Sequence, residues 1–334
     1  MPLSSKTTQT NVQNHFRPGR QADRRINRRT LLKGVGGLAA ASFVGGGAVV
    51  AGSAPAQAAL TVAEHEDHGR MQYYKLATSS IGWLPRVNVL LPDGYDTSRR
   101  YPVLFLLHGG GENYSTFDTK YDIRNHTAGR DLIVVMPDGG AAGWYSDPES
   151  SNVGPRNWET FHVDELIPWV DATFSTIAQP AGRAVSGFSM GGFGALKYAA
   201  KHPELFGSVS CHSGPADLRI QDGAVVHWAN FTAGATDLKG GTIYGIPWDQ
   251  ARVSADNPVE HVESYRGKRI FLVSGTESDR YESVVLPSQR SFEKALDGAG
   301  IGYEHYEDTG AHIVRWGRVQ QDIDSMLNFL TKAG

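Results

Sequence analysis

Short apolar runs separated by polar segments set the predicted architecture of this chain. They cover residues 71–79, 86–92, 102–107, 131–136, 183–187, 207–211, 269–274 and 303–307. Runs that are apolar throughout, such as Val-Leu-Phe-Leu-Leu at 103–107, are typical of strands buried on both faces. After the third run they alternate with helical patterns, the last an amphipathic stretch at 316–330. This alternation predicts an α/β fold, a doubly wound and mostly parallel sheet flanked by helices.

The first 58 residues follow a different pattern and are excluded from this fold. They contain Asn-Arg-Arg-Thr-Leu-Leu-Lys at 27–33, a glycine-interrupted apolar stretch, and Ala-Gln-Ala at 56–58. A basic segment, a mildly apolar segment and a small-residue cleavage site make up an export signal, and the paired arginines indicate the twin-arginine type. We therefore expect a secreted protein in which residues 59–334 form one domain with no stable membrane span.

Charge and cysteine content argue against some classes of partner and exclude a disulfide within the chain. Residues 1–58 hold eight Lys or Arg and one Asp, a balance of +7, so the net charge moves from −3 for the whole chain to about −10 without them. An acidic protein disfavours nucleic acid and anionic membranes as partners. The single cysteine, Cys211, excludes an intramolecular disulfide and lies in a strand-like run, where it is expected to be a buried small hydrophobe.

A serine motif stands at the end of one predicted strand. Residues 187–191 read Gly-Phe-Ser-Met-Gly and lead directly into a helical pattern. A serine hydroxyl is a poor nucleophile at neutral pH, so it needs a neighbouring base and backbone N–H groups aimed at the developing oxyanion. A sharp strand-to-helix turn with small flanking residues provides this exposure. We predict Ser189 as a nucleophile and the Met190 N–H as an oxyanion donor.

A glycine-rich loop follows an earlier strand. The run at 102–107 continues into His-Gly-Gly-Gly at 108–111. Glycines allow a backbone N–H to approach a substrate oxygen closely, and we expect Gly110 to supply the second donor. His108 lies too close to this loop to be the expected base, and we interpret it as a structural hydrogen-bonding residue.

The base and the acid are expected later in the chain, because serine, acid and histidine occur in that order in this arrangement. The strand at 269–274 precedes a loop that holds Glu277 and Asp279, and the last strand precedes Thr-Gly-Ala-His at 309–312. Of the 12 histidines, only His312 has this order and context. The pattern predicts His312 as the base and leaves the acid open between the two carboxylates.

Together these motifs resemble the esterase branch of the α/β-hydrolases, which includes feruloyl esterases, S-formylglutathione hydrolases and secreted mycolyltransferases. The similarity rests on Gly-Phe-Ser-Met-Gly-Gly, Leu-His-Gly-Gly-Gly, and Gly-Thr-Glu-Ser-Asp ahead of Gly-Ala-His, and it spans residues 70–330. Matched position by position, it places the acid on Asp279, with Glu277 as the alternative. It implies a serine carboxylic-ester hydrolase that forms an acyl-enzyme on a small-molecule, glycan or lipid ester, with no cofactor and no metal.

The resemblance breaks at positions that help mycolyltransferases to hold a sugar acceptor. Those enzymes carry Asp-Gly-Leu-Arg where this chain has residues 108–111, and a tryptophan where it has Val314. The departures argue against mycolyl transfer to trehalose and favour hydrolysis. Acyl transfer to envelope lipids or sugars is the enzymatic alternative, and a secreted, non-catalytic binding protein with a hydrolase fold is the alternative from another class.

Three other segments carry expectations. Trp144 and Tyr145, in the loop after the fourth predicted strand, either wall a substrate pocket or anchor the loop by packing. Residues 215–260 are predicted to form a cap-like insertion that selects the substrate. His-Glu-Asp-His at 65–68 lacks the His-Glu-x-x-His spacing of a helical metal site, so we expect a mobile, solvated terminus there.

Overall fold

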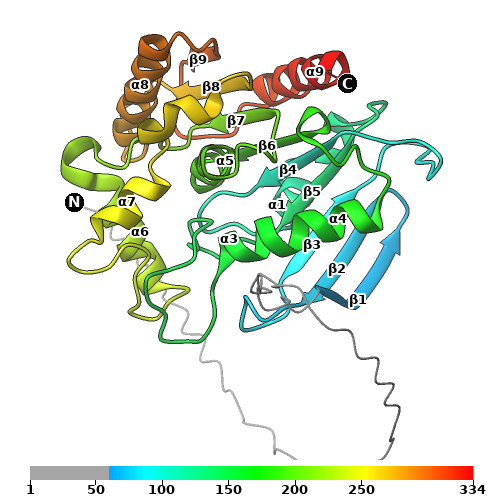
Figure 1. Cartoon of the computed structure of the whole chain (residues 1–334), viewed down its shortest axis with the longest axis horizontal. Helices are drawn as coiled ribbons and strands as arrows, with labels where there is room; N and C mark the ends of the chain where they lie inside the picture. Colours follow the sequence, from blue (N-terminus) through cyan, green and yellow to red (C-terminus); the bar gives the residue numbers. More distant parts are fainter. Residues whose placement is uncertain (1–59, 334) are drawn as a thin grey trace, which may run out of the picture. The chain divides into compact units, whose positions relative to one another are not determined.

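The computed structural model describes residues 60–333, so the predicted export signal at residues 1–58 lies outside the described residues. The described residues form a nine-stranded sheet (Figure 1). Its strands are β1 (Thr61–His68), β2 (Met71–Ala77), β3 (Arg86–Leu90), β4 (Val103–Leu107), β5 (Ile133–Pro137), β6 (Arg183–Phe188), β7 (Ser208–His212), β8 (Arg269–Gly275) and β9 (Glu304–Asp308).

The strand order is β1-β2-β3-β5-β4-β6-β7-β8-β9. The first three strands run antiparallel to their neighbours, and β5, β4, β6, β7, β8 and β9 are parallel. This confirms the predicted doubly wound, mostly parallel α/β fold. Because the carboxyl ends of parallel strands share one edge, the loops that follow β4, β6, β8 and β9 meet there.

Helices cover both faces of the sheet. They are α1 (Thr116–Thr119), α2 (Ile123–His126), α3 (Trp158–Thr160), α4 (Ile167–Thr173), α5 (Met190–Lys201), α6 (Ile220–Ala235), α7 (Gln250–Asp256), α8 (Glu282–Ala299) and α9 (Trp316–Ala333). Alternate residues of β4 belong to different cores: Phe105 packs with apolar residues of α4, α5 and α8, and Leu106 with those of α1, α2 and α9. The fully apolar run at 103–107 follows from this burial on two sides.

The terminus expected to be mobile is instead the edge strand β1. It pairs antiparallel with β2, placing Glu66 opposite Tyr73, and His65 stacks on Tyr74 with ring centroids 4.4 Å apart. Every residue of β1 is exposed, so the segment lacks the apolar alternation by which the other strands were predicted. Within residues 60–333 no group of three or more metal-binding side chains occurs, and no helix is long and apolar enough to cross a membrane.

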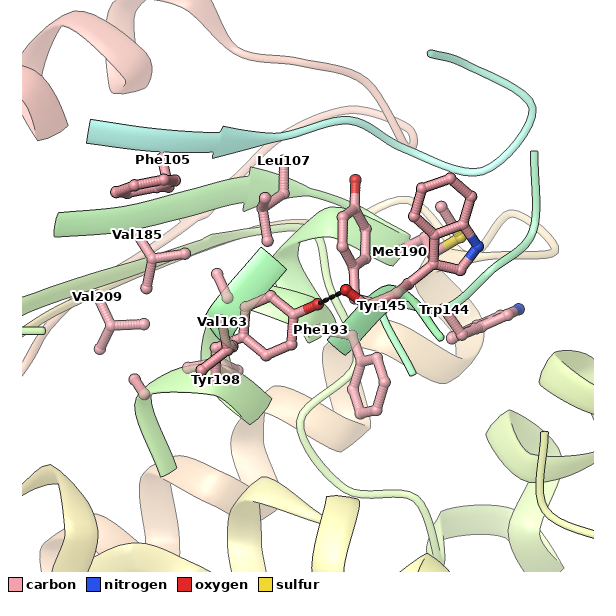
Figure 2. Packing of buried hydrophobic residues seen from close by; sticks show 14 of the residues in the cluster. Phe105, Leu107, Trp144, Tyr145, Val163, Val185, Met190, Phe193, Tyr198 and Val209 are labelled. Carbon is pink, nitrogen blue, oxygen red and sulfur yellow. Dashed lines mark hydrogen bonds between the residues drawn. The ribbon is translucent and has the colours of Figure 1, made fainter. Parts of the chain in front are cut away.

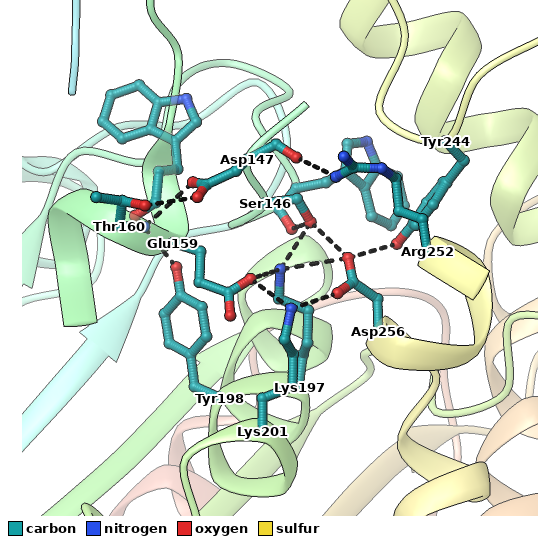
Figure 3. A network of polar contacts seen from close by, with 12 residues as sticks. Ser146, Asp147, Glu159, Thr160, Lys197, Tyr198, Lys201, Tyr244, Arg252 and Asp256 are labelled. Carbon is teal, nitrogen blue, oxygen red and sulfur yellow. Dashed lines mark hydrogen bonds and ion pairs between the residues drawn. The ribbon is translucent and has the colours of Figure 1, made fainter. Parts of the chain in front are cut away.

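A buried ion cluster ties the 215–260 insertion to the helix that follows the serine motif (Figure 3). Lys197 of α5 is fully buried, with its Nζ 2.9 Å from Glu159 and 3.5 Å from Asp256, the last residue of α7. One turn further along α5, Lys201 contacts both carboxylates at 2.9 Å. Burial raises the pKa of Glu159, but the lysines and a hydrogen bond with His202 outweigh it, so the pKa lies well below its ordinary value. The ion cluster therefore fixes the insertion against α5.

We expect Lys197→Met to lower the free energy of unfolding by about 3 kcal/mol or more, because it removes one cation from a buried cluster and leaves its carboxylate partners in a low-dielectric site. Denaturant unfolding of the variant and of wild type measures this change. Lys294→Met, at an exposed position of α8, is the matched control and should be nearly neutral. A similar stability for the two variants would contradict the anchoring role.

Candidate active site

The serine motif forms a sharp turn between β6 and α5. Ser189 has φ 55° and ψ −118°, a conformation that L-residues rarely adopt, and its N–H donates to the His212 carbonyl oxygen at 2.8 Å. A Cβ atom on Gly187 would lie 2.3 Å from the Gly191 carbonyl group, and one on Gly191 would lie 2.1 Å from the Leu107 carbonyl oxygen. Only glycine fits at these two positions, and this close packing holds Ser189 at the sheet edge.

The Ser189 hydroxyl heads a continuous line of contacts. Its Oγ lies 2.8 Å from His312 Nε2, and His312 Nδ1 lies 3.1 Å from Glu282 Oε1. Glu282 is the first residue of α8 and is 1% exposed, and its second carboxylate oxygen is buried without a hydrogen-bond partner in the described part of the chain. The rings of Phe188 and Tyr281, each with its centroid 4.9 Å from that of the imidazole, hold His312 in place. The arrangement is that of a nucleophile, a base and an orienting carboxylate.

Asp279, predicted from the sequence to orient the imidazole, makes different contacts. Its carboxylate accepts backbone N–H bonds from Tyr281 at 2.8 Å, Glu282 at 2.7 Å and His312 at 2.8 Å. Burial raises the pKa of Asp279, but these bonds outweigh it and the pKa is lowered. Asp279 therefore caps the start of α8 and fixes the His312 backbone, whereas the imidazole nitrogen faces Glu282.

The alternative acid, Glu277, is also displaced from the imidazole. Its side chain is exposed, and its backbone N–H donates to the Gly310 carbonyl oxygen at 3.1 Å. A sequence signal for the observed arrangement does exist, because Asp-Arg-Tyr-Glu at 279–282 has the spacing of a helix capping box. Interpreted in that way, the aspartate is a helix cap and the glutamate three residues later belongs to the first turn of the helix.

Both predicted oxyanion donors border a cavity that also contains Ser189 and His312. Within the glycine loop, Gly109 N–H donates to Glu112 Oε2 at 3.0 Å and Gly111 N–H to the Ala141 carbonyl oxygen at 2.7 Å. No partner within residues 60–333 occupies the N–H of Gly110 between them. Met190 begins α5, where the first N–H groups have no intrahelical acceptor and carry the positive end of the helix dipole.

Glu112 holds the glycine loop and was not singled out by the sequence. Besides accepting from Gly109, its carboxylate accepts from Lys120 Nζ at 3.0 Å and from the Tyr121 hydroxyl at 2.9 Å. His108 also stabilises this loop. Its Nδ1 donates to the Gly109 carbonyl oxygen at 2.8 Å, and its Nε2 accepts from Gly139 N–H at 2.9 Å. Burial lowers the pKa of His108, so the ring is neutral and structural, as expected.

The cavity has a volume of about 580 Å³ and one aromatic wall. Trp144 lines it and donates from its indole N–H to Thr232 Oγ1 at 3.0 Å. Trp228 of α6 meets Trp144 edge to face, with centroids 5.6 Å apart, and stacks on Tyr281 at 5.2 Å. The insertion at 215–260 thus supplies part of the wall beside Ser189.

Tyr145, considered as a second pocket residue, does not line this cavity. It is fully buried, and its hydroxyl donates to the His108 carbonyl oxygen at 2.8 Å. A Cβ atom on Gly194 of α5 would lie 2.6 Å from the ring, which packs near Met190 and Phe193 (Figure 2). The sequence left open whether these two residues wall a pocket or anchor the loop by packing. In the structure Trp144 lines the cavity and Tyr145 anchors the loop.

Comparisons with known proteins agree with this fold. Residues 78–330 match the family model described as "Putative esterase". The chain is 56% identical over 283 residues to Esterase Rv1288 of Mycobacterium tuberculosis, which covers 81% of this chain and 62% of that protein, so the chain spans about three fifths of this relative's length. It is 37% identical over 251 residues to the MPT51 antigen of Mycobacterium leprae, covering 68% of this chain and 80% of that protein.

Solved structures show the same architecture. An S-formylglutathione hydrolase from Agrobacterium tumefaciens matches with a TM-score of 0.64 at 19% identity, covering 81% of this chain and 98% of its own. A ferulic acid esterase matches with a TM-score of 0.59 at 20% identity, covering 78% and 98%. At these identities the likeness shows the α/β-hydrolase fold. With the family match over most of its length, the chain belongs to the "Putative esterase" family.

Proposed function

We propose that this protein is a secreted serine carboxylic-ester hydrolase that acts through an acyl-enzyme, with Ser189, His312 and Glu282 as its triad. The observation that carries the proposal is the unbroken line from Ser189 Oγ through the imidazole to the buried Glu282 carboxylate, at 2.8 and 3.1 Å. Export is part of the proposal and rests on the sequence of residues 1–58.

The positions of these groups support the following reaction. As Ser189 Oγ attacks the ester carbonyl carbon, His312 Nε2 takes the hydroxyl proton, and the Glu282 charge stabilises the imidazolium that forms. The negative charge on the carbonyl oxygen is stabilised by the N–H groups of Gly110 and Met190. His312 then returns the proton to the departing alcohol, which leaves an acyl group on Ser189. A water molecule then attacks the acyl carbon as His312 takes one of its protons, and His312 returns that proton to Ser189 Oγ as the acid leaves.

Asp279 and Glu112 do not contact the reacting atoms in this scheme but position the residues that do. Asp279 is a positioning residue, because it holds the backbone of His312 and the first turn of α8 in one hydrogen-bonded unit. Glu112 is a positioning residue for the glycine loop, because it takes up the N–H of Gly109 and leaves that of Gly110 directed to the substrate. The substrate is a small-molecule, glycan or lipid ester whose apolar part lies along the tryptophan wall.

Acyl transfer to an alcohol is the second candidate function. Hydrolysis and transfer share one acyl-enzyme and differ in whether water or an alcohol attacks it. Gly111 and Val314, which differ from the acceptor-binding residues of mycolyltransferases, both line the catalytic cavity, where an acceptor alcohol would enter. Product analysis with an added alcohol separates the two functions, since transfer must outcompete hydrolysis in water.

We expect the chain without residues 1–58 to hydrolyse para-nitrophenyl esters, and Ser189→Ala and His312→Ala to lower kcat by about 10³-fold or more without unfolding the protein. Rates over a series of acyl lengths, with circular dichroism of each variant, check this. Turnover that survives in Ser189→Ala would sink the acyl-enzyme mechanism. A folded protein that neither turns over these esters nor reacts with a fluorophosphonate at Ser189 would favour the non-catalytic binding protein.

We expect Glu282→Gln to lower kcat by about 10²- to 10⁴-fold, because the amide no longer stabilises the imidazolium or selects its tautomer. Asp279→Asn should cost about tenfold or less, since an asparagine still accepts hydrogen bonds at a helix start. Glu277→Gln is the matched control and should leave kcat unchanged. Steady-state kinetics of the three variants decide the assignment, and a larger loss at Asp279 or Glu277 than at Glu282 would reverse it.

A further inference from the structure

A second pocket lies on one face of the three antiparallel strands β1, β2 and β3, where the sequence predicted a mobile terminus. The strand register places Glu66, Tyr73 and Asn88 directly opposite one another, and Glu64, Lys75 and Arg86 in the next row. Residues opposite one another in an antiparallel sheet point to the same face. These six side chains, His68, Tyr74, Tyr114 and Ser115 line a pocket of about 340 Å³, which we call the β1–β3 pocket.

Asn88 in this pocket has no side-chain hydrogen-bond partner among residues 60–333. Its side chain is 1% exposed, and neither the amide oxygen nor the amide nitrogen is bonded to any described residue. A buried carboxamide without partners costs free energy, because both its donor and its acceptor capacity are lost on transfer from water. The backbone of β3 carries no such cost, because its strand pairs with β2 on one side and β5 on the other. The unsatisfied groups are those of the Asn88 side chain. The pocket therefore contains a polar group that a ligand or a bound water would satisfy.

The other pocket groups indicate the chemistry of the ligand. Two carboxylates on β1, Glu64 and Glu66, face Lys75 on β2 and Arg86 on β3, so the formal charges of these four side chains sum to zero. Lys75 is already paired with Glu64, and Arg86 donates to the Tyr114 hydroxyl. Such a balance gives no net attraction for a strongly charged ligand. It offers donors and acceptors side by side, which suits hydroxyl groups because each is both a donor and an acceptor.

Two tyrosines add a flat apolar surface to these polar groups. Tyr73 is partly exposed, and its hydroxyl is already bonded to Asp118 and Arg124. Its ring meets that of His68 nearly at a right angle, with centroids 5.0 Å apart, and forms part of the pocket surface. Tyr114 stands on the loop between β4 and α1 and lines the same pocket, with Arg86 Cζ 5.5 Å from its ring centroid. A ring with hydroxyl groups at its rim and C–H groups on its faces fits a site that combines aromatic planes with a carboxamide and ion-paired side chains.

We propose that the β1–β3 pocket binds a neutral saccharide, with Asn88 accepting and donating hydrogen bonds to its hydroxyl groups and Tyr73 and Tyr114 packing against its ring. The loop that walls this pocket with Tyr114 also lines the catalytic cavity with Glu112. The two sites are thus separated by a single loop. The bound saccharide is either the alcohol part of the ester or a separate glycan on which the enzyme docks.

The test measures binding directly, in a Ser189→Ala background, so that it does not depend on the proposed catalysis. Neutral trisaccharides (maltotriose, cellotriose and xylotriose) and a uronic-acid trisaccharide are titrated by calorimetry and saturation-transfer NMR. We expect at least one neutral trisaccharide to bind in the millimolar range or tighter, and Asn88→Leu to weaken it by about tenfold or more. Asn152→Leu, at an exposed asparagine in another loop, is the matched control and should bind as wild type does.

Three results would overturn the proposal: no neutral trisaccharide binds, Asn88→Leu binds as well as wild type, or the uronic-acid trisaccharide binds more tightly than the neutral ones. The first would assign the Asn88 amide to a bound water. If Asn88→Leu does not fold, Tyr114→Ala provides the same test from the opposite wall, with several-fold weaker binding expected. A kinetic measurement with Ser189 restored separates the two possible roles of the saccharide. If Asn88→Leu has a higher KM for an acetylated trisaccharide but not for para-nitrophenyl acetate, the saccharide is the alcohol part of the substrate. If the KM for the acetylated trisaccharide is unchanged, the pocket binds a separate glycan.

Discussion

The close contact between the first turn of α5 and the ends of β4 and β6 is the constraint on which the rest of the site depends. Gly187 and Gly191 allow backbones to approach within distances that any side chain would prevent, and the turn between them forces Ser189 into a conformation with positive φ. The conformation is held by its surroundings, including the hydrogen bond from Ser189 N–H to the β7 end at His212. The hydroxyl, the helix N-terminus and the glycine loop after β4 converge because these three segments touch.

Two acidic residues three positions apart have different tasks because of their environments. Asp279 is surrounded by backbone N–H groups, which favour its charged form and make it a structural anion at a helix start. Glu282 is almost fully buried, and within residues 60–333 the one hydrogen-bond partner of its carboxylate is the imidazole. A charge in that place has few competing interactions, so its effect is concentrated on the histidine. Their positions in the sequence did not show which of Asp279 and Glu282 orients His312, whereas their hydrogen-bond partners do.

Features determined by local pattern could be predicted from the sequence, and features determined by tertiary contacts could not. The buried strands and the amphipathic helix at 316–330 were predictable because apolar periodicity reports burial directly. The serine turn and the glycine loop were recognisable because their backbone geometry demands particular small residues. Glu282 was missed because its side chain becomes significant only once α8 is docked beside His312. The edge strand β1 was missed because pairing with β2, rather than burial of apolar side chains, holds it in place.

The ion cluster around Lys197 separates the attachment of the 215–260 insertion from the lining of the catalytic cavity. It fixes the insertion to α5 through Asp256 of α7, whereas Trp228 and Thr232 of α6 line the catalytic cavity. Substitution of Trp228 or Thr232 therefore leaves the contacts of the ion cluster in place, while it changes what packs against Tyr281 and Trp144. For the proposed hydrolase, substitutions on this one helix are therefore a starting point for directed evolution of substrate specificity.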